Sequence, residues 1–241
     1  MRTYNALGPA LRSFGPNPKV AILLLIVGTF FSWLAFVAAR EFRGTIAWTI
    51  FYLIAAGLGL LMVSHLSFRL WVHDSGISYR GIRGYNEIRW PDLERVYAGA
   101  YSIHAHYVPL GTLHRLRLMV KHGPGLSIGE RVHGAEELTD LIQSFTLEEM
   151  LRRALHQYEN GIEVDFGRIR IGRRTGVRYR KWFAWREIRW EDLTVYGVSD
   201  THVNFSGARN LFPVNIAAEK VANVHVLEEL LDKIVRQRQY R

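Results

Sequence analysis

The sequence EIRWPDL at residues 87–93 recurs as EIRWEDL at residues 187–193, and this repeat decides the fold. In a β-strand, alternate side chains share a face, so the isoleucine and the tryptophan lie on one face and the glutamate and the arginine on the other. We expect both isoleucines and both tryptophans to lie in hydrophobic cores. The aspartate that follows each tryptophan suits a turn. The repeat predicts a duplicated domain, whose defining residues include Trp90, Asp92, Trp190 and Asp192.

Two apolar stretches precede the repeat. Residues 20–39 read VAILLLIVGTFFSWLAFVAA and residues 45–64 read TIAWTIFYLIAAGLGLLMVS, without a charge in either. Each has about the 20 residues that a helix needs to cross the hydrocarbon core of a bilayer. We predict a transmembrane helical hairpin over residues 20–64. A cleaved signal peptide ending at Ala39 is the alternative, but its apolar core would be too long and would begin too late.

The short connection between the two stretches, residues 40–44, places both chain ends on one side of the membrane. Cytoplasmic loops carry an excess of Lys and Arg. The connection carries two arginines and one glutamate, whereas the outer flanks of the hairpin carry Arg2, Arg12, Lys19, Arg69 and Arg80. This bias predicts a multi-pass membrane protein, with residues 1–19 and the soluble domains in the cytoplasm.

The soluble part has the pattern of two similar units of short strands, each ending in a helix. Alternating strands begin at residues 70–74 and 162–166. After the repeat, one additional residue predicts a β-bulge in the first unit, and the further residues around 98–112 predict a longer loop. The predicted boundaries are 66–145 for the first domain, 146–160 for a linking helix and 161–241 for the second domain.

Capping residues predict where the later helices begin. Thr146 and Glu149 match the capping box of a helix that starts at about residue 147. Asn223 is a favourable N-cap residue and is included among the residues that define the fold. An apolar stripe follows it at Val224, Leu227, Leu230, Leu231 and Ile234.

Strands, a W-x-D-L turn, more strands and a terminal helix, repeated after a membrane hairpin, resemble the bacterial pleckstrin-homology-like (PH-like) domains. Residues 161–241 resemble a family of uncharacterised bacterial membrane proteins through GIEVDFG at 161–167, the turn at Trp190 and Asn223 before the helix. The resemblance implies an α+β fold with two transmembrane helices and two tandem PH-like domains, each an antiparallel sheet or partly open barrel with a C-terminal helix. It also implies a location in the inner (cytoplasmic) membrane, but it implies no activity.

The sequence contains no constellation that predicts catalysis. Without cysteine, disulfides and thiolate metal sites are excluded. There is no HExxH, Walker, G-x-S-x-G or kinase motif. His104 and His106 would share a face of a strand, but no dependable third or fourth metal ligand is near them in the sequence. We therefore expect no catalytic residue, metal or cofactor, and no enzymatic activity.

The strongest local feature is basic. Residues 168–189, RIRIGRRTGVRYRKWFAWREIR, contain nine Arg or Lys and one acidic residue. Interleaved arginines and tryptophans suit a membrane interface with anionic lipids. In PH domains, which this part resembles, basic residues of the first hairpin meet phosphorylated lipid headgroups. The predicted lipid-binding or partner-binding residues are Arg173, Arg174, Arg178, Arg180, Lys181 and Trp182.

Other interpretations of the basic segment remain open at this point. It can be the generic electrostatic face of a domain tethered near an anionic leaflet, with its aromatics in the core. It can also be an interface with another membrane protein or a second copy, which would make the protein a homo-oligomeric or protein-docking scaffold. Nucleic acid is the weaker interpretation, because an isoelectric point of about 10.0 is accompanied by no nucleic-acid-binding motif.

Overall fold

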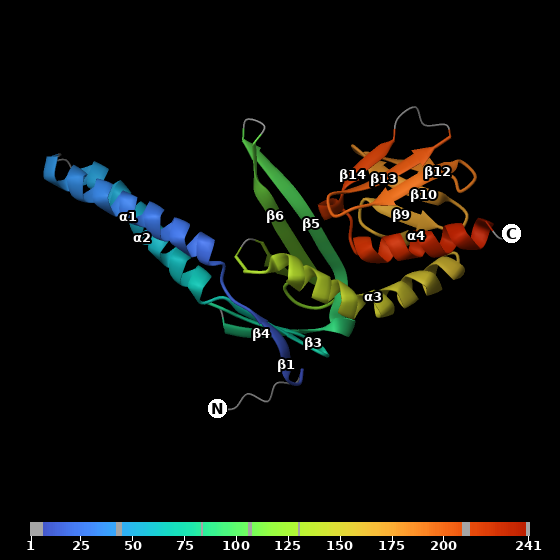
Figure 1. Ribbon diagram of the computed structural model, residues 1–241, viewed down its shortest axis with the longest axis horizontal. Coiled ribbons are helices and arrows are strands. Elements are labelled where there is room, and N and C mark those ends of the chain that lie inside the picture. Colours follow the sequence, from blue (N-terminus) through green and yellow to red (C-terminus); the bar gives the residue numbers. More distant parts are fainter. Residues whose placement is uncertain are drawn as a thin grey trace. The chain divides into compact units, whose positions relative to one another are not determined.

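The computed structural model describes residues 7–41, 45–82, 84–105, 108–129, 131–208 and 213–239, without the side chains of residues 41, 45–47, 101–105 and 108–113. Figure 1 shows its helices and strands and labels many of them. The chain divides into two compact units. Unit 1 comprises Met1–Arg89 and Glu130–Gly134, and unit 2 comprises Trp90–Gly129 and Ala135–Arg241.

Unit 1 contains a helical hairpin. Its helices, α1 (Pro18–Glu41) and α2 (Thr45–Leu66), run side by side (Figure 1). Both are long and apolar enough to span a membrane, and only 6% of each apolar stretch is buried within the protein. A core helix of a soluble domain would be mostly buried. Most of the connection at 40–44 lies outside the described residues.

The helical hairpin is inserted between two paired strands of a four-stranded antiparallel sheet. In sheet order, the strands are β1 (Ala10–Phe14), β2 (Arg69–His73), β3 (Gly76–Gly81) and β4 (Gly84–Arg89). The chain leaves β1 directly into α1 and returns from α2 directly into β2. Residues 10–14 of the N-terminal segment therefore belong to the same sheet as the strands that follow the helices.

Strand pairing and hydrogen bonds connect the two helices to the sheet. Phe14 at the end of β1 is paired with Leu70 at the start of β2. The ring of His65, near the end of α2, donates from Nε2 to the carbonyl of Asn17 at 2.9 Å. The amide of Asn17 donates to the carbonyl of Arg131 at 2.8 Å. These contacts hold the first residues of α1 and the last residues of α2 at one edge of the sheet.

Unit 2 contains three antiparallel sheets and two long helices. The first sheet is formed by β5 (Leu93–Ala105), β6 (Val108–Val120) and β7 (Leu126–Ile128). The second is formed by β8 (Val164–Asp165), β9 (Ile169–Gly172), β10 (Gly176–Lys181) and β11 (Ala184–Ile188). The third is formed by β12 (Leu193–Val198), β13 (His202–Gly207) and β14 (Val214–Ala217). The helices are α3 (Ala135–Glu159) and α4 (Val224–Gln239), with short 3-10 turns η1 (Trp90–Asp92) and η2 (Ala218–Lys220).

One order of elements occurs twice along the chain. Four antiparallel strands, then three, then a helix form the first copy (β1–β7 and α3) and again the second copy (β8–β14 and α4). The first copy belongs to both units, with β1–β4 in unit 1 and β5–β7 and α3 in unit 2. This order confirms the α+β class, with two apolar N-terminal helices, antiparallel sheets and a C-terminal helix.

The repeated EIRW sequences occupy equivalent positions. Ile88 of β4 is paired with Ile77, and Ile188 of β11 is paired with Val177. The structure buries both isoleucines and both tryptophans, which agrees with the predicted core. Trp90 stacks on Phe145 of α3 with ring centroids 5.4 Å apart. The indole of Trp190 donates to the carbonyl of Gly172 at 2.9 Å.

The pairing corrects the predicted strand correspondence. Residues 70–74 correspond to β9, not to residues 162–166, because β2 and β9 each pair with the strand that begins at Gly76 or Gly176. The short β8 is the equivalent of β1. The bulge predicted after Leu93 is present, and an equivalent register shift follows Leu193. The bulge is therefore a shared feature and does not absorb a residue present in one copy only.

Two further predictions were wrong. In place of the longer loop predicted around residues 98–112, the structure has two paired strands, since β5 and β6 stay paired as far as Ala105 opposite Val108, with a register shift after Ile103. The helix predicted to start at residue 147 is the second half of α3, which runs through Thr146 without a break. The Thr146 hydroxyl donates to the carbonyl of Ile142 at 2.7 Å, one turn back, and does not cap a new helix.

Candidate functional site

The basic residues predicted to bind a ligand lie on the sheet β8–β11. Along β10, Val177 and Tyr179 are buried, so Arg178 and Arg180 lie on the opposite, outer face of the sheet. The pairing places Arg170 of β9 beside Arg178. The alternation of β10 therefore lines up several cations on one outer face.

Arg178 is held by a carboxylate. Its Nη1 donates to both oxygens of Glu163, at 2.8 and 3.0 Å, and the hydroxyl of Thr175 donates to the same carboxylate at 3.2 Å. The hydrogen bond from Arg178 holds the pKa of Glu163 below its usual value. Arg178 thus has an internal partner, and the carboxylate of Glu163 already balances its charge.

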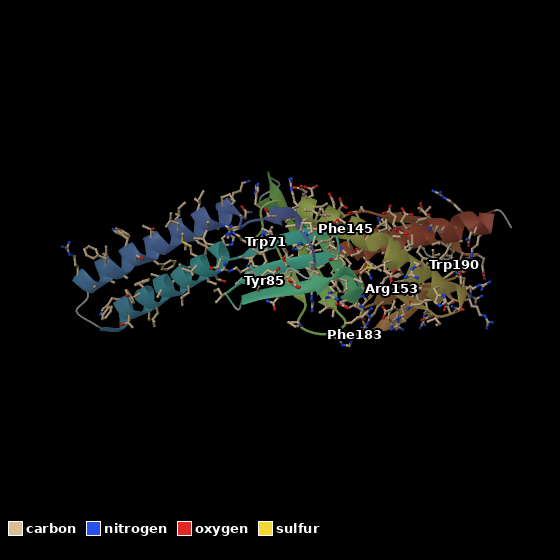
Figure 2. All side chains as sticks on the ribbon, turned by 90° about the horizontal axis from the view of Figure 1, so that it is seen from below. Trp71, Tyr85, Phe145, Arg153, Phe183 and Trp190 are labelled. Carbon is tan, nitrogen blue, oxygen red and sulfur yellow. The ribbon has the colours of Figure 1, made fainter. Side chains whose placement is uncertain are left out.

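An aromatic ring also engages this face. The guanidinium carbons of Arg170 and Arg178 lie 4.4 and 5.7 Å from the centroid of Trp185, within the range of a cation–π contact. In the first copy the positions of Arg170 and Trp185 are occupied by Trp71 and Tyr85, whose rings are 6.4 Å apart (Figure 2). In both copies, two side chains packed against each other therefore occupy the central part of the outer face.

The predicted residues Arg173 and Arg174 lie in the turn between β9 and β10. Arg173 donates from Nη1 to the carbonyl of Glu159 at 2.9 Å, at the end of α3. Arg174 is exposed and has no side-chain partner in the described part of the chain. Because β8 precedes β9, this turn joins the second and third strands of the copy and is not its first hairpin.

The opposite end of β10 carries an exposed tip with a different composition. The two-residue turn between β10 and β11 consists of Trp182 and Phe183, with 81% and 89% of their surface exposed. Arg180 and Lys181 precede it. The amide of Arg180 donates to the carbonyl of Arg168 at 2.9 Å, which places Arg168 beside them. We call Arg168, Arg180, Lys181, Trp182 and Phe183 the basic-aromatic tip.

Within the described part of the chain, the cations of this tip are free of internal partners. Within the residues that the structure describes, Arg168, Arg180 and Lys181 form no ion pair and no side-chain hydrogen bond. All three side chains are exposed. They can therefore bind an external anion without first breaking an internal contact.

The six predicted binding residues do not form one site. Arg173 and Arg174 lie at one end of β10, whereas Arg180, Lys181 and Trp182 lie at the other, roughly 20 Å away at about 3.3 Å per residue. Arg178 lies between them and is bound to Glu163. The tip adds two residues that the sequence interpretation missed, Arg168 and Phe183. Alignment with the glycine-flanked turn at residues 81–84 of the first copy would have identified the Trp182–Phe183 pair as a turn.

Asn223 has a different role from the predicted cap. It directly precedes α4, but its side-chain oxygen accepts from the amide of Val96 on β5 at 2.7 Å, and its side-chain amide donates to the carbonyl of Glu94 at 3.3 Å. The backbone amide of Asn223 donates to the carbonyl of Val96 at 2.7 Å. Asn223 thus joins β5 of the first copy to the start of the last helix.

The two turn aspartates act through their backbone. The carbonyl of Asp92 accepts from the amide of Lys121 at 2.9 Å, and the carbonyl of Asp192 accepts from the amide of Ala208 at 2.7 Å. Each bond ties the start of the first strand of a three-stranded sheet to the end of the second. The equivalent bonds place Asp92 and Asp192 at corresponding corners of the two copies.

Among the described residues, neither the cavities nor the possible metal ligands identify a second site with a recognisable chemistry. A cavity of about 710 Å³ lies on the first sheet of unit 2, where Arg115 and Arg117 of β6 and Glu219 of η2 line it. The described residues hold no cluster of His, Asp or Glu fit for a metal ion. The side chains of His104 and His106 lie outside the described part of the chain.

The family of the chain is shown by its similarity to known proteins. No curated protein matches it. A family model matches essentially the whole chain, from residue 1 to residue 240. The chain belongs to this family, the family of unknown function DUF6585.

Proposed function

We propose that this is a non-enzymatic, membrane-anchored protein with PH-like domains that bind anionic lipid headgroups. The observation that carries the proposal is the basic-aromatic tip. It has three cations without internal partners among the described residues and two exposed aromatic side chains, in a chain with two helices that can span a membrane.

The anchor is supported by length and by exposure. At 1.5 Å per residue the 24 residues of α1 extend about 36 Å and the 22 residues of α2 about 33 Å. The hydrocarbon core of a bilayer is about 30 Å thick. Large apolar side chains of both helices, among them Leu25, Phe36 and Leu53, are exposed. A bilayer would cover this surface.

The proposed location follows from charge and connectivity. The basic flanks favour the cytoplasmic side of an inner membrane for the sheets and for both ends of the chain. Pairing of β1 with β2 supports the same side for the segments before α1 and after α2, because a strand pair cannot be divided by a bilayer.

The order of elements supports two PH-like domains. Each copy has four antiparallel strands, then three, then a helix, and this is the order that the resemblance implies. We extend the first domain beyond residues 66–145 by β1 and by the rest of α3, which is one continuous helix, and we place the second domain at residues 161–241. Function does not follow from this fold, so the proposal rests on the tip.

Headgroup binding at the tip would be electrostatic. Arg168 and Arg180 can each offer several N–H donors to a phosphate, and Lys181 adds a point charge. Each cation near an anionic leaflet contributes about 1 kcal/mol, and salt screens this attraction. Arg170 and Arg178, held by Asp165, Glu163 and Trp185, would contribute less.

Lysine footprinting of the full chain in nanodiscs tests the proposal. Acylation of Lys181 is expected to be slower in nanodiscs that contain phosphatidylglycerol than in phosphatidylcholine nanodiscs, and high salt should restore it. Lys233, on α4, serves as the internal control. The double variant Arg168→Glu, Arg180→Glu should abolish the protection, and Arg174→Glu, at the far end of β10, should leave it intact. Equal acylation of Lys181 in both lipids would refute headgroup binding.

A further inference from the structure

The aromatic pair at the tip is more exposed than the large apolar side chains described on the helical hairpin. Trp182 and Phe183 are 81% and 89% exposed, whereas the most exposed large apolar side chain described on α1 or α2, Leu60, reaches 72%. Side chains of this size are normally at least partly covered in a soluble protein. The pair therefore needs an apolar environment outside the described fold.

Local backbone geometry does not account for a tryptophan at this turn. Trp182 has a positive φ of 56°, a conformation in which a bulky side chain is rarely found. It is the first of the two central turn residues, a position that two-residue hairpins with this geometry usually give to glycine, asparagine or aspartate. The turn conformation therefore does not explain why a tryptophan side chain is present at this position.

The same arrangement occurs in the first copy. The turn between β3 and β4 begins with Ile82, which is 66% exposed and corresponds to Trp182. Behind it, Arg69 and Arg80 are paired across β2 and β3, and they correspond to Arg168 and Arg180. Both copies thus place an exposed apolar residue at the start of this turn, immediately beyond two exposed arginines that lie side by side.

The cations select the occupant of this surface. A protein partner would have to offer an apolar pocket and acidic side chains placed around it. The interface of an anionic bilayer satisfies both, because cations bind phosphates and tryptophan is favoured at the boundary between headgroups and acyl chains. The turn residues extend beyond Arg180 and Lys181 along the strand, so their rings would reach deeper than the cations.

We propose that Trp182 and Phe183 insert into the bilayer beneath the headgroups that Arg168, Arg180 and Lys181 bind, with Ile82 as the equivalent contact of the first copy. This inference rests on the proposed function and deepens it. It predicts penetration into the acyl-chain region, which headgroup binding alone does not require.

Because the chain contains no cysteine, one introduced cysteine can carry a fluorescent reporter at a single position of the full chain. Ala184→Cys, exposed next to the tip, would carry an environment-sensitive fluorophore while both aromatics remain in place. In nanodiscs of phosphatidylcholine and phosphatidylglycerol, we expect blue-shifted emission and quenching by lipids brominated in the acyl chain. Val195→Cys, exposed on β12, is the matched position that should show neither.

A tip variant separates insertion from mere proximity. In the Trp182→Gly, Phe183→Ser background, acyl-chain quenching of the reporter at position 184 is expected to fall severalfold. Glycine suits the positive φ, so the turn is retained, and near-ultraviolet circular dichroism checks the fold. Trp182→Tyr with Phe183→Leu should preserve the quenching, because these side chains also enter the interface.

The outcomes distinguish this inference from the proposed function. Protection of Lys181 together with quenching only by headgroup-attached quenchers would leave lipid binding intact and overturn insertion. Acyl-chain quenching that persists undiminished in the Trp182→Gly, Phe183→Ser variant would also overturn it. A blue shift without lipid quenching that disappears on dilution would overturn it as well and assign the tip to a second copy of the chain. Acyl-chain quenching without Lys181 protection would support insertion and refute anionic headgroup binding.

Discussion

At the scale of residues, the arginines of the sheet β8–β11 differ in the partners of their side chains. The side chain of Arg178 donates to both oxygens of Glu163 and approaches the ring of Trp185. The side chain of Arg180, two positions along the same face, has no partner among the described residues. In the sequence, both are arginines of the same basic segment, and nothing local distinguishes them. The difference arises because Glu163, outside the basic segment, reaches one of them and not the other.

The Glu163–Arg178 pair should contribute to stability in a pH-dependent way. Both side chains are about 30% exposed, so Glu163→Gln is expected to lower the free energy of unfolding by about 1 kcal/mol at neutral pH. The pKa of Glu163 is lowered in the folded state, so the stabilisation is present above the unfolded pKa and is lost as pH falls through the folded one. Unfolding in detergent should therefore show wild type and variant converging in acid. Glu191→Gln, in an exposed pair, is the control, and a constant difference at all pH values would contradict this role.

His225 should make the protein sensitive to acid. Burial lowers its pKa from 6.5 to about 4, and its Nδ1 is buried without a described partner. The unfolded state then binds more protons between these values, so stability falls as pH decreases from 6.5 to about 4, by up to roughly 3 kcal/mol at 1.36 kcal/mol per unit. Thermal unfolding of His225→Leu across this range should show a smaller slope. His202→Leu, at an exposed position, should retain the wild-type slope.

At the scale of elements, one glycine in each copy permits a close strand contact. A Cβ on Gly76 would lie 2.3 Å from the carbonyl oxygen of Ile88, and a Cβ on Gly176 would lie 2.3 Å from that of Ile188. No real Cβ approaches a backbone oxygen so closely, so the strands would have to separate. The repeated contact explains why the EIRW strands have the same register in both copies.

Alanine at either glycine should therefore destabilise its own sheet. We expect Gly76→Ala and Gly176→Ala each to lower the free energy of unfolding by about 1 to 3 kcal/mol, as for other overpacked sites. Gly176 should be the more sensitive because its φ of +82° also disfavours alanine. Gly197→Ala on β12, where a Cβ has nothing within 4 Å, should change stability little. Denaturant unfolding measures all three, and equal effects would disprove the contact argument.

Substitutions of Asn223 should lower the stability of the protein by different amounts. Its positive φ of 50° and its bond to the amide of Val96 are separate requirements. Asn223→Asp keeps an acceptor, Asn223→Gly keeps the backbone conformation, and Asn223→Ala keeps neither. An unpaired buried amide costs about 1 to 3 kcal/mol, so the loss of stability should increase from Asp or Gly to Ala. Thermal unfolding gives the order, and an alanine variant as stable as wild type would exclude the bond to β5 as a determinant.

The elements that could be predicted are those with a strong local pattern. The stripe Val224, Leu227, Leu230, Leu231 and Ile234 is buried in α4 as the periodicity requires. The continuity of α3 through Thr146 could not be predicted, because Thr and Glu three residues apart fit a helix interior as well as a capping box. In α3, Thr146 bonds to Ile142, and Glu149 pairs with Arg152 and Arg153. Strand β8 has two residues, too few to show a period.

The candidate site was predictable in composition but not in arrangement. The excess of cations in residues 168–189 is visible in the sequence, and Arg180, Lys181 and Trp182 were identified from it. Their separation from Arg173 and Arg174 depends on the position of two turns, and the partner of Arg178 comes from another segment. Turn positions and non-local partners are properties of the folded chain.

At the scale of the whole molecule, the main feature is that an apolar helical hairpin interrupts a β-sheet. β1 and β2 are neighbours in the sheet but are separated in the chain by α1 and α2. Three residues connect β1 to α1, and two connect α2 to β2. Such short connections leave the sheet of unit 1 little freedom relative to its helices, so an embedded hairpin would hold this sheet at the membrane surface.

This connectivity predicts a sidedness that single cysteines can test. If α1 and α2 cross the bilayer, Leu11→Cys on β1 and Val195→Cys on β12 must be on one face and Arg40→Cys, at the far end of α1, on the other. In sealed right-side-out vesicles, a membrane-impermeant maleimide should label only Arg40→Cys, and permeabilisation should expose the other two. Labelling of Leu11→Cys and Val195→Cys from outside would reverse the proposed orientation but keep the hairpin. Labelling of all three before permeabilisation would mean that the helices do not span, because a paired β1–β2 cannot have a bilayer between its strands.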